Sequence, residues 1–443
     1  MINIFEYVHT SGRKTDKIQS DFIKQHTNNI LISLIHGLRQ SNSGFETIKK
    51  SATRDIKEYQ EELGNDSKLF VDSGGYSILS GEIPFSKIRH SIECYNWVLE
   101  NIMSEYGDYI FSLDIPIFLK EPQYNTASLI KEVNQKSLEQ SLDILNNNTN
   151  LYDKFIFVWQ FKSKIQYAVW CELYHEFFRD NQNLKHFAIG GMVGLRGIVD
   201  IKFSPFITLA FKCAHELFKK NDHDETSLIH ILGVYHLHDR FAMAFLHKLF
   251  NELYFSACHR NIQITYDTVN YMLSGLYNVR ELNMMMFDEN QITHMRADDL
   301  IKQVDKMSSE SHIQDVIKED LELLQNGKPL NNPAMTSLIN IVHNINIDKI
   351  FNHVIDEYNI IEIFLNNCQR HTTLRPQLLP LLLDLERKYP QAFKKRTYKN
   401  LENFEWMRQL HVWWMKGCNK DLLEQKIYQF IKAINFPVDL REM

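Results

Sequence analysis

Short apolar runs recur along the first two thirds of the chain, and six of them end abruptly in a carboxylate, an amide or a glycine. Runs of this length with turn signals behind them are typical of buried strands. The pattern predicts eight strands, at residues 29–36, 68–72, 109–116, 155–160, 186–191, 228–234, 261–267 and 282–287. The mixed, polar residues 1–28 are expected to form a cap or an irregular lead-in.

Helix-compatible stretches separate these runs. In residues 86–106 the apolar positions Ile88, Ile92, Tyr95 and Leu99 recur at helical spacing. Further helices are predicted at 126–146, 164–180, 205–220 and 239–250. Strands that alternate with helices in this way favour a (β/α)₈ TIM barrel over an open, doubly wound sheet. The open sheet remains the alternative, and it would spread the strand ends along a crevice.

From about residue 298 the strand runs disappear and helical periodicity replaces them. We therefore expect a catalytic barrel at 1–295 and a helical, mildly basic region at 296–443. Helices are predicted there at 312–325, 334–343, 347–366 and 378–388. Residues 391–443 carry ten Lys and Arg against six Asp and Glu, interleaved with aromatics. That composition suits nucleic acid, although an amphipathic helix with its tryptophans packed inward explains it equally.

The segment Lys68-Leu-Phe-Val-Asp-Ser-Gly-Gly-Tyr-Ser77 combines a buried strand with candidate chemistry. Asp72 ends the strand, two glycines open the backbone, and the aromatic ring of Tyr76 follows. This arrangement suits a flat polar ligand, while a plain Asx turn is the simpler interpretation. Later runs end in a similar way, at Asp114, Gln160, Gly190, Gly191, Gly233 and Asp267. A closed barrel would gather these ends in one mouth, where the chemistry of such barrels takes place.

Composition narrows the class of protein. The chain has 443 residues, a net charge of −6 and 44% hydrophobic residues, as ordinary globular proteins do. This charge argues against broad adhesion to nucleic acid but leaves room for a local basic groove. The six cysteines are scattered without a Cys-x-x-Cys pair, which predicts reduced thiols and a cytoplasmic location. No signal-peptide layout or membrane-length apolar run occurs, so we expect no membrane partner.

In their order along the chain, the motifs resemble the tRNA-guanine transglycosylase family and its DNA-acting relatives. Those relatives include DNA 7-deazaguanine transglycosylases and phage-defence glycosylases that remove modified bases. The resemblance covers roughly residues 29–290, and Asp72-Ser-Gly-Gly-Tyr76 is its most specific part. The motifs Ser112-Leu-Asp-Ile-Pro116, Val158-Trp-Gln160, Ile189-Gly-Gly-Met192, His230-Ile-Leu-Gly-Val234 and Tyr266-Asp-Thr268 follow in the family's order.

The resemblance implies a role for each matching position. Asp267 corresponds to the nucleophile that attacks the anomeric carbon of the sugar. Asp72 corresponds to the carboxylate that contacts the base and moves its proton. Asp114, Gln160 and the amides of Gly190 and Gly191 correspond to groups that read the base edge. Tyr76 and Leu232 correspond to the two faces of the slot that clamps the base. No metal and no cofactor is implied at this site.

The chain also departs from the family. The tRNA enzymes carry a Cys-x-Cys-x₂-Cys and a later histidine for structural zinc, and nothing after Asp267 fits that spacing. Ser77 replaces a frequent glutamine, and Val269-Asn-Tyr271 replaces an arginine-containing follow-on. These changes favour DNA over tRNA and a modified base over guanine. Base excision in anti-phage defence is the leading interpretation. Base exchange in DNA, a tRNA-guanine transglycosylase, and a non-catalytic nucleic-acid-binding subunit are the alternatives, and the oligomeric state stays open.

Several other residues have competing interpretations. His230, His236 and His238 with Asp239 have metal-ligand spacing, although a strand end and a helix start explain them. Arg196 suits a phosphate or base substituent as well as it suits a surface loop. The glycines at 190–197 lack the lysine of a phosphate loop and the spacing of a dinucleotide fingerprint. Met284–Met286 is interpreted as core of the eighth strand, and Lys394-Lys-Arg396 as a phosphate patch or a solvated surface.

Overall fold

The computed structural model covers the whole chain and describes most of its first 357 residues. The described residues are 6–11, 17–27, 29–34, 45–63, 67–79, 81, 83–115, 126–160, 164–191, 226–234, 261–268, 283–288, 291–326, 328 and 333–357, with single residues between 209 and 251. The predicted helix at 378–388 and the basic, aromatic stretch 391–443 lie outside this part of the chain.

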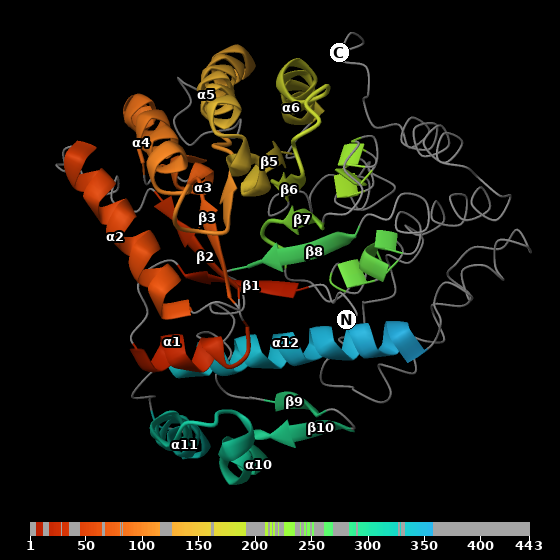
Figure 1. Ribbon diagram of the computed structural model, residues 1–443. Coiled ribbons are helices and arrows are strands. Elements are labelled where there is room, and N and C mark those ends of the chain that lie inside the picture. Colours follow the sequence, from red (N-terminus) through yellow and green to blue (C-terminus); the bar gives the residue numbers. More distant parts are fainter. Residues whose placement is uncertain are drawn as a thin grey trace, which may run out of the picture.

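A curled sheet of parallel strands forms the centre of the structure (Figure 1). Its strands are β1 (Glu6–Ser11), β2 (Asn29–Ser33), β3 (Lys68–Asp72), β4 (Tyr109–Phe111), β5 (Phe155–Gln160), β6 (His186–Gly190), β7 (Ser227–Ile231) and β8 (Ile262–Asp267). Each strand pairs with the next along the chain, and β1 also pairs with β8, which closes the ring of hydrogen-bonded strands. An open, doubly wound sheet does not have this closure.

Helices connect the strands and cover the outside of the sheet (Figure 1). They are α1 (Lys17–Lys24), α2 (Phe45–Leu63), α3 (Gly75–Leu79), α4 (Ile88–Asn101), α5 (Ala127–Asn147) and α6 (Lys164–Phe177). Helix α5 starts where the Thr126 side chain accepts a hydrogen bond from the Leu129 amide, 3.3 Å away, as an N-cap does. The predicted α/β class and the barrel-like curl are confirmed. Described residues such as Leu209 and Met243 are helical, within the helices predicted at 205–220 and 239–250.

Most strand predictions agree with the structure, and those at 68–72 and 155–160 are confirmed residue for residue. Two were wrong. The segment predicted as an irregular lead-in contains β1 and α1, and β1 supplies the strand that closes the ring. The segment 282–287 is not a ring strand. Strand β9 (Asn283–Asp288) pairs antiparallel with β10 (Gln291–Arg296) in a separate two-stranded sheet. Met284–Met286 therefore does not belong to an eighth ring strand.

Helices follow this hairpin, as the periodicity predicts. They are α10 (Ala297–Leu300), α11 (Ser311–Gln325) and α12 (Pro333–Glu357). Helix α12 is continuous through its described length, where the sequence predicted a break between two helices at residues 344–346. It lies beside α1 and against β9 (Figure 1).

A buried ionic network ties α12 to the sheet. Arg240 donates from Nε to Asp348 Oδ1 at 2.7 Å and from Nη1 to Asn344 Oδ1 at 2.8 Å. The hydroxyl of Tyr266, on β8, donates to the other oxygen of Asp348. A buried charge is tolerated when it is paired and hydrogen-bonded in this way. Helix α12 is therefore fixed to the strand that also carries Asp267.

Side chains alternate between the inside and the outside of the ring. Leu31, Phe70, Phe111, Ile156, Val158, Ala188 and Leu228 form a small apolar cluster of their own. Their neighbours on the same strands, among them Val71, Phe157 and Ile229, belong to the large cluster that packs against the helices. Because successive residues of a strand point to opposite faces, the small cluster lies on the interior face. The interior is thus a packed core below the strand ends.

In the described part of the chain, no helix is both long enough and apolar enough to cross a membrane. The cysteines of that part, Cys94, Cys171 and Cys213, are buried and form no disulfide.

Candidate functional site at the carboxyl ends of the strands

Toward the carboxyl ends of the strands, the residues that face the interior of the ring change from apolar to polar. Two positions past an interior apolar residue stand Ser33 on β2, Asp72 on β3, Gln160 on β5, Gly190 on β6 and His230 on β7. Since every second residue of a strand shares a face, these positions line the interior at the carboxyl ends. One end of the ring therefore has a polar lining above an apolar floor, which is the layout of a site rather than of a core.

Asp72 is a half-buried carboxyl group at the tip of β3. Its Oδ2 accepts a hydrogen bond from the Gly74 amide at 3.1 Å, which is the Asx turn that the sequence suggested. Burial raises the pKa of Asp72 to about 7, and repulsion from Asp114 and Asp267 adds to the shift. The bonds from Gly74 and from the Ser33 side chain oppose this shift without cancelling it. Asp72 can therefore hold or release a proton near neutral pH.

Asp114 is buried next to the tip of β4, between two side-chain donors. The Ser73 hydroxyl donates to its Oδ1 at 2.8 Å, and the Gln160 amide donates to its Oδ2. Burial raises the pKa of Asp114 to about 6, although these two bonds pull it down. The carboxyl and the amide thus form one fixed unit, which presents both donors and acceptors to the mouth.

Glycines allow this unit to sit close to the backbone. A Cβ atom on Gly75 would lie 2.2 Å from the backbone oxygen of Asp114, and one on Gly190 would lie 2.5 Å from Nε2 of Gln160. A side chain on Gly75 would collide with the backbone, and one on Gly190 would displace the Gln160 amide. The glycines of the two motifs therefore serve close packing, while Gly74 and Gly191 adopt positive φ angles of 83° and 79°.

Asp267 lies at the tip of β8 and is almost fully buried, with 8% of its surface exposed. Its Oδ1 accepts a hydrogen bond from the Gly233 amide at 3.1 Å and another from His230 Nε2 at 3.2 Å. The other ring nitrogen of His230 bonds the Thr265 hydroxyl at 2.8 Å. A histidine with hydrogen on Nε2 satisfies both bonds, because the hydroxyl can donate to Nδ1. The carboxylate is thereby held in one orientation.

The His230 ring is fully buried and has aromatic neighbours. Its centroid lies 5.6 Å from that of Phe70 and 4.9 Å from that of Phe111. The rings fix the imidazole from the apolar floor, while the polar groups fix it from the strand ends. This histidine therefore acts as a rigid support beneath Asp267.

The three carboxyl groups lie close enough to interact electrostatically. Asp114 and Asp267 both repel the charged form of Asp72, so the electrostatic field of each reaches the same group. Asp72 and Asp267 stand on β3 and β8, with only β2 and β1 between them in the ring. The expectation that Asp72 and Asp267 act together depends on this arrangement.

The remaining predicted positions are only partly described. Leu232 is half-buried and packs against the interior cluster, and its amide bonds the Ile189 oxygen at 2.9 Å. Tyr76 belongs to α3 by its backbone, and its side chain lies outside the described part. Arg196 also lies outside it. The mouth therefore contains Asp72, Asp114, Gln160, Gly190 and Asp267 together.

Of the residues with metal-ligand spacing, only His230 lies in the described part of the chain, since residues 236–239 are outside it. His230 uses both ring nitrogens for hydrogen bonds within the protein. A different group of possible ligands comes from α1 and the start of α11. The ligand atoms of Asp21, Glu310 and His312 lie within 4.8 Å of one another, at a partly exposed position.

No family model matches the chain, and no curated protein is similar enough to count as a relative. The resemblance to the transglycosylase family therefore rests on the sequence motifs alone.

Four residues of the site had no supporting role in the sequence prediction: Ser33 and Thr265 were not named, and Ser73 and His230 were named for other reasons. Ser33 and Ser73 donate to Asp72 and Asp114, and His230 and Thr265 support Asp267. A signal for the last two was present. A histidine inside the apolar run 228–234 needs a polar partner when it is buried, and Thr265 stands opposite it on β8.

Proposed function

We propose that the protein is a DNA glycosylase that cleaves the N-glycosidic bond of a flipped-out, modified nucleobase and leaves an abasic site. The observation that carries this proposal is the pair of acids in one mouth. Asp72 has a pKa near neutrality, and Asp267 is oriented by His230 and Gly233. The modified base and a role in anti-phage defence come from the family resemblance alone.

The reaction uses the two acids differently. Cleavage of an N-glycosidic bond develops positive charge on the sugar and negative charge on the departing base. Protonated Asp72 gives its proton to the leaving base nitrogen as the bond breaks, and a pKa of about 7 suits that task. The Asp267 carboxylate attacks the anomeric carbon from the other face and forms a glycosyl-enzyme bond. Water then attacks that carbon, gives its proton to Asp72 and frees Asp267.

The rest of the mouth would select the base. A base inside a duplex is inaccessible, so it must be everted and read along its edge. The fixed pair of Asp114 and Gln160 offers a carboxyl and an amide for this purpose, and the half-buried Leu232 offers an apolar face. Tyr76 is the second face of the slot in this proposal. The amides of Gly190 and Gly191 complete the edge contacts.

The proposal also extends to the fold of the whole chain. The closed sheet would be the centre of a complete (β/α)₈ barrel at 1–295, with a helical region at 296–443 that helps to hold DNA. Reduced thiols and a DNA substrate fit a cytoplasmic protein. Base exchange, in which a second base attacks the glycosyl-enzyme in place of water, is the second candidate, because the same two carboxyl groups would serve both reactions.

Genomic DNAs of phages with different base modifications, and plain DNA, provide the test. Each DNA is incubated with the protein and then treated with alkali, which breaks strands at abasic sites. We expect breaks in at least one modified DNA and none with the Asp267→Ala variant. Incorporation of a labelled 7-deazaguanine without breaks would establish exchange. No reaction with any DNA or tRNA would refute both enzymatic proposals and favour a binding subunit.

A further inference from the structure

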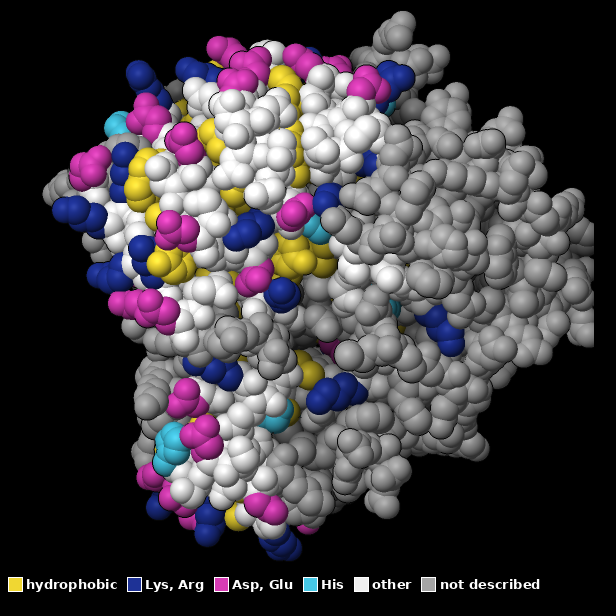
Figure 2. Space-filling model, in the orientation of Figure 1, with side chains coloured by type: hydrophobic (Ala, Val, Ile, Leu, Met, Phe, Trp, Pro, Cys, Tyr) yellow, Lys and Arg dark blue, Asp and Glu magenta, His cyan; other side chains and the backbone are white. Residues whose placement is uncertain are grey.

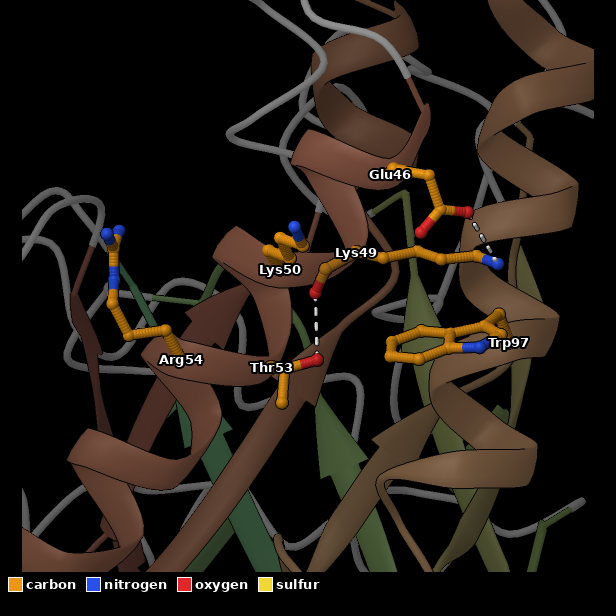
Figure 3. Close-up of a pocket in the computed structure, with 6 residues that line it drawn as sticks. All are labelled: Glu46, Lys49, Lys50, Thr53, Arg54 and Trp97. Atoms are coloured by element: carbon orange, nitrogen blue, oxygen red, sulfur yellow. Dashed lines mark hydrogen bonds and ion pairs between the residues drawn. The ribbon is translucent and has the colours of Figure 1, made fainter.

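A groove on the outer wall of the ring, between α2 and α4, has three cationic side chains among its six lining residues (Figure 3). It has a volume of about 310 Å³, and its lining consists of Glu46, Lys49, Lys50, Thr53, Arg54 and Trp97. Three of these side chains are cationic and one is anionic. In Figure 3, Lys49 extends from α2 toward the Trp97 ring of α4, and its Nζ lies 5.1 Å from the ring centroid.

The groove lies toward the end of the ring that carries the candidate site. Helix α2 follows β2, so it begins at the carboxyl end of the strands and runs back toward the amino end of β3. Lys49 and Lys50 lie in the second turn of α2, and Arg54 lies at its middle. Asp72 stands at the carboxyl end of β3, so the two lysines lie toward the end of the ring that carries Asp72.

The cations remain accessible to a ligand. Lys50 is exposed and makes no ion pair among the described residues. Arg54 has a side chain that is 63% exposed, and it bonds Asp55 from its Nε and Nη2 atoms. Figure 2 shows Lys and Arg side chains along the left edge, over α2, with acidic side chains between them. An elongated anion that meets several cations at once suits this surface better than a single small ion.

We propose that this groove binds phosphate groups of the nucleic-acid backbone next to the everted base. That the ligand is a nucleic acid rests on the proposed function. Lys50 and Arg54 would contact phosphates, and Lys49 would add charge while it stays on Trp97. The contacts would be independent of base sequence and sensitive to salt, since each phosphate contact releases counterions.

Fluorescence anisotropy with labelled DNA and RNA duplexes of one sequence tests the inference. The Lys50→Ala/Arg54→Ala variant is compared with Lys136→Ala/Arg179→Ala, which removes the same charges from α5 and from the end of α6. We expect the α2 variant to bind about tenfold more weakly and to lose about 2 from the slope of log Kd against log salt concentration. The control should match the wild type. The duplex that the wild type binds with higher affinity, DNA or RNA, identifies the nucleic acid that supplies the phosphates.

Equal affinity and equal salt slope in the two variants would overturn the inference, as would a wild-type protein that binds neither duplex. Melting curves check that both variants fold as the wild type does. Base release is measured separately. If the α2 variant binds more weakly but the wild type releases no base, phosphate binding in the groove is supported and the glycosylase activity is refuted. If base is released but the α2 variant binds as the wild type does, the activity is supported and phosphate binding in the groove is refuted.

Discussion

His230 donates a hydrogen bond from Nε2 to Oδ1 of Asp267 across 3.2 Å, between neighbouring strands of the ring. The Gly233 amide donates to the same oxygen. Two donors on one oxygen fix the plane of the carboxylate and therefore the direction from which it can attack. In the proposed reaction, His230 is a positioning residue that acts through Asp267.

His230→Phe should slow base release while it leaves DNA affinity unchanged. Phenylalanine keeps the ring between Phe70 and Phe111 but removes the donor to Asp267. A misplaced nucleophile costs on the order of 100-fold in rate, so kcat should fall by about that factor with KM unchanged. Thr265→Val is the matched variant, which removes only the bond to Nδ1 and should cost less. A larger loss with Thr265→Val than with His230→Phe would contradict this role.

Asp72→Asn should stabilise the protein, and the gain should grow with pH. The folded state raises the pKa of Asp72 from 3.8 to about 7, so it binds the proton more tightly than the unfolded chain does. The resulting stability is present below pH 3.8 and is lost as pH rises to about 7. Above that range the variant should be more stable by on the order of 2 kcal/mol, a value reduced because the carboxyl is partly exposed.

Urea unfolding at several pH values measures this gain against the wild type. Asp143→Asn, at an exposed position of α5, is the control and should give a flat difference. A difference for Asp72→Asn that stays flat or shrinks as pH rises would show that Asp72 is not a protonated acid in the folded protein.

Gly190→Ala should destabilise the fold through Gln160 rather than through the backbone. Its Cβ would meet the Gln160 amide at 2.5 Å, and crowding of this kind costs about 1–3 kcal/mol. The double variant Gly190→Ala/Gln160→Ala should recover part of that loss, because the amide that clashes is gone. Denaturant titrations of both single variants and the double variant measure the coupling. Strictly additive effects would mean that these side chains do not meet.

Asp348→Asn should be strongly destabilising although it lies far along the chain from the mouth. Removing one partner leaves Arg240 buried without a counter-charge, which costs about 3–5 kcal/mol. Arg240→Met/Asp348→Leu should recover most of that loss. Thermal melts compare these variants with Glu93→Ala, which breaks an exposed pair with Arg89 on α4. A melting temperature for Asp348→Asn like that of Glu93→Ala would contradict the tie between α12 and the sheet.

The ring strands that were predicted well have one physical signature. In β3 and β5 an unbroken apolar run ends in a polar residue, because both faces of the strand are covered. The sequence of β1, EYVHTS, lacks this signature, and its pairing partners β2 and β8 lie elsewhere in the chain. The methionines of β9 have the signature without the ring pairing. Closure of the ring depends on distant partners, which a local pattern does not contain.

As with the strands, the parts of the site that local sequence patterns reveal were predicted, and those that depend on distant partners were not. The carboxyl and amide groups at strand tips were visible, because the chain changes abruptly there from apolar to polar. The support beneath Asp267 was not, because His230 looks like one residue of an apolar strand. Its role appears only when the register places Thr265 opposite it and Asp267 above it.

The roles of the two acids are measured by single-turnover release of free base, followed by mass spectrometry on a DNA that the wild type cleaves. The wild type, Asp267→Asn and Asp72→Asn are compared at pH 6 and pH 8. We expect Asp267→Asn to release at least about 1,000-fold less base at both pH values, since the nucleophile is gone. Asp72→Asn should lose most at pH 6, where the wild-type acid is protonated. Release at the wild-type rate by both variants would refute the two-acid mechanism.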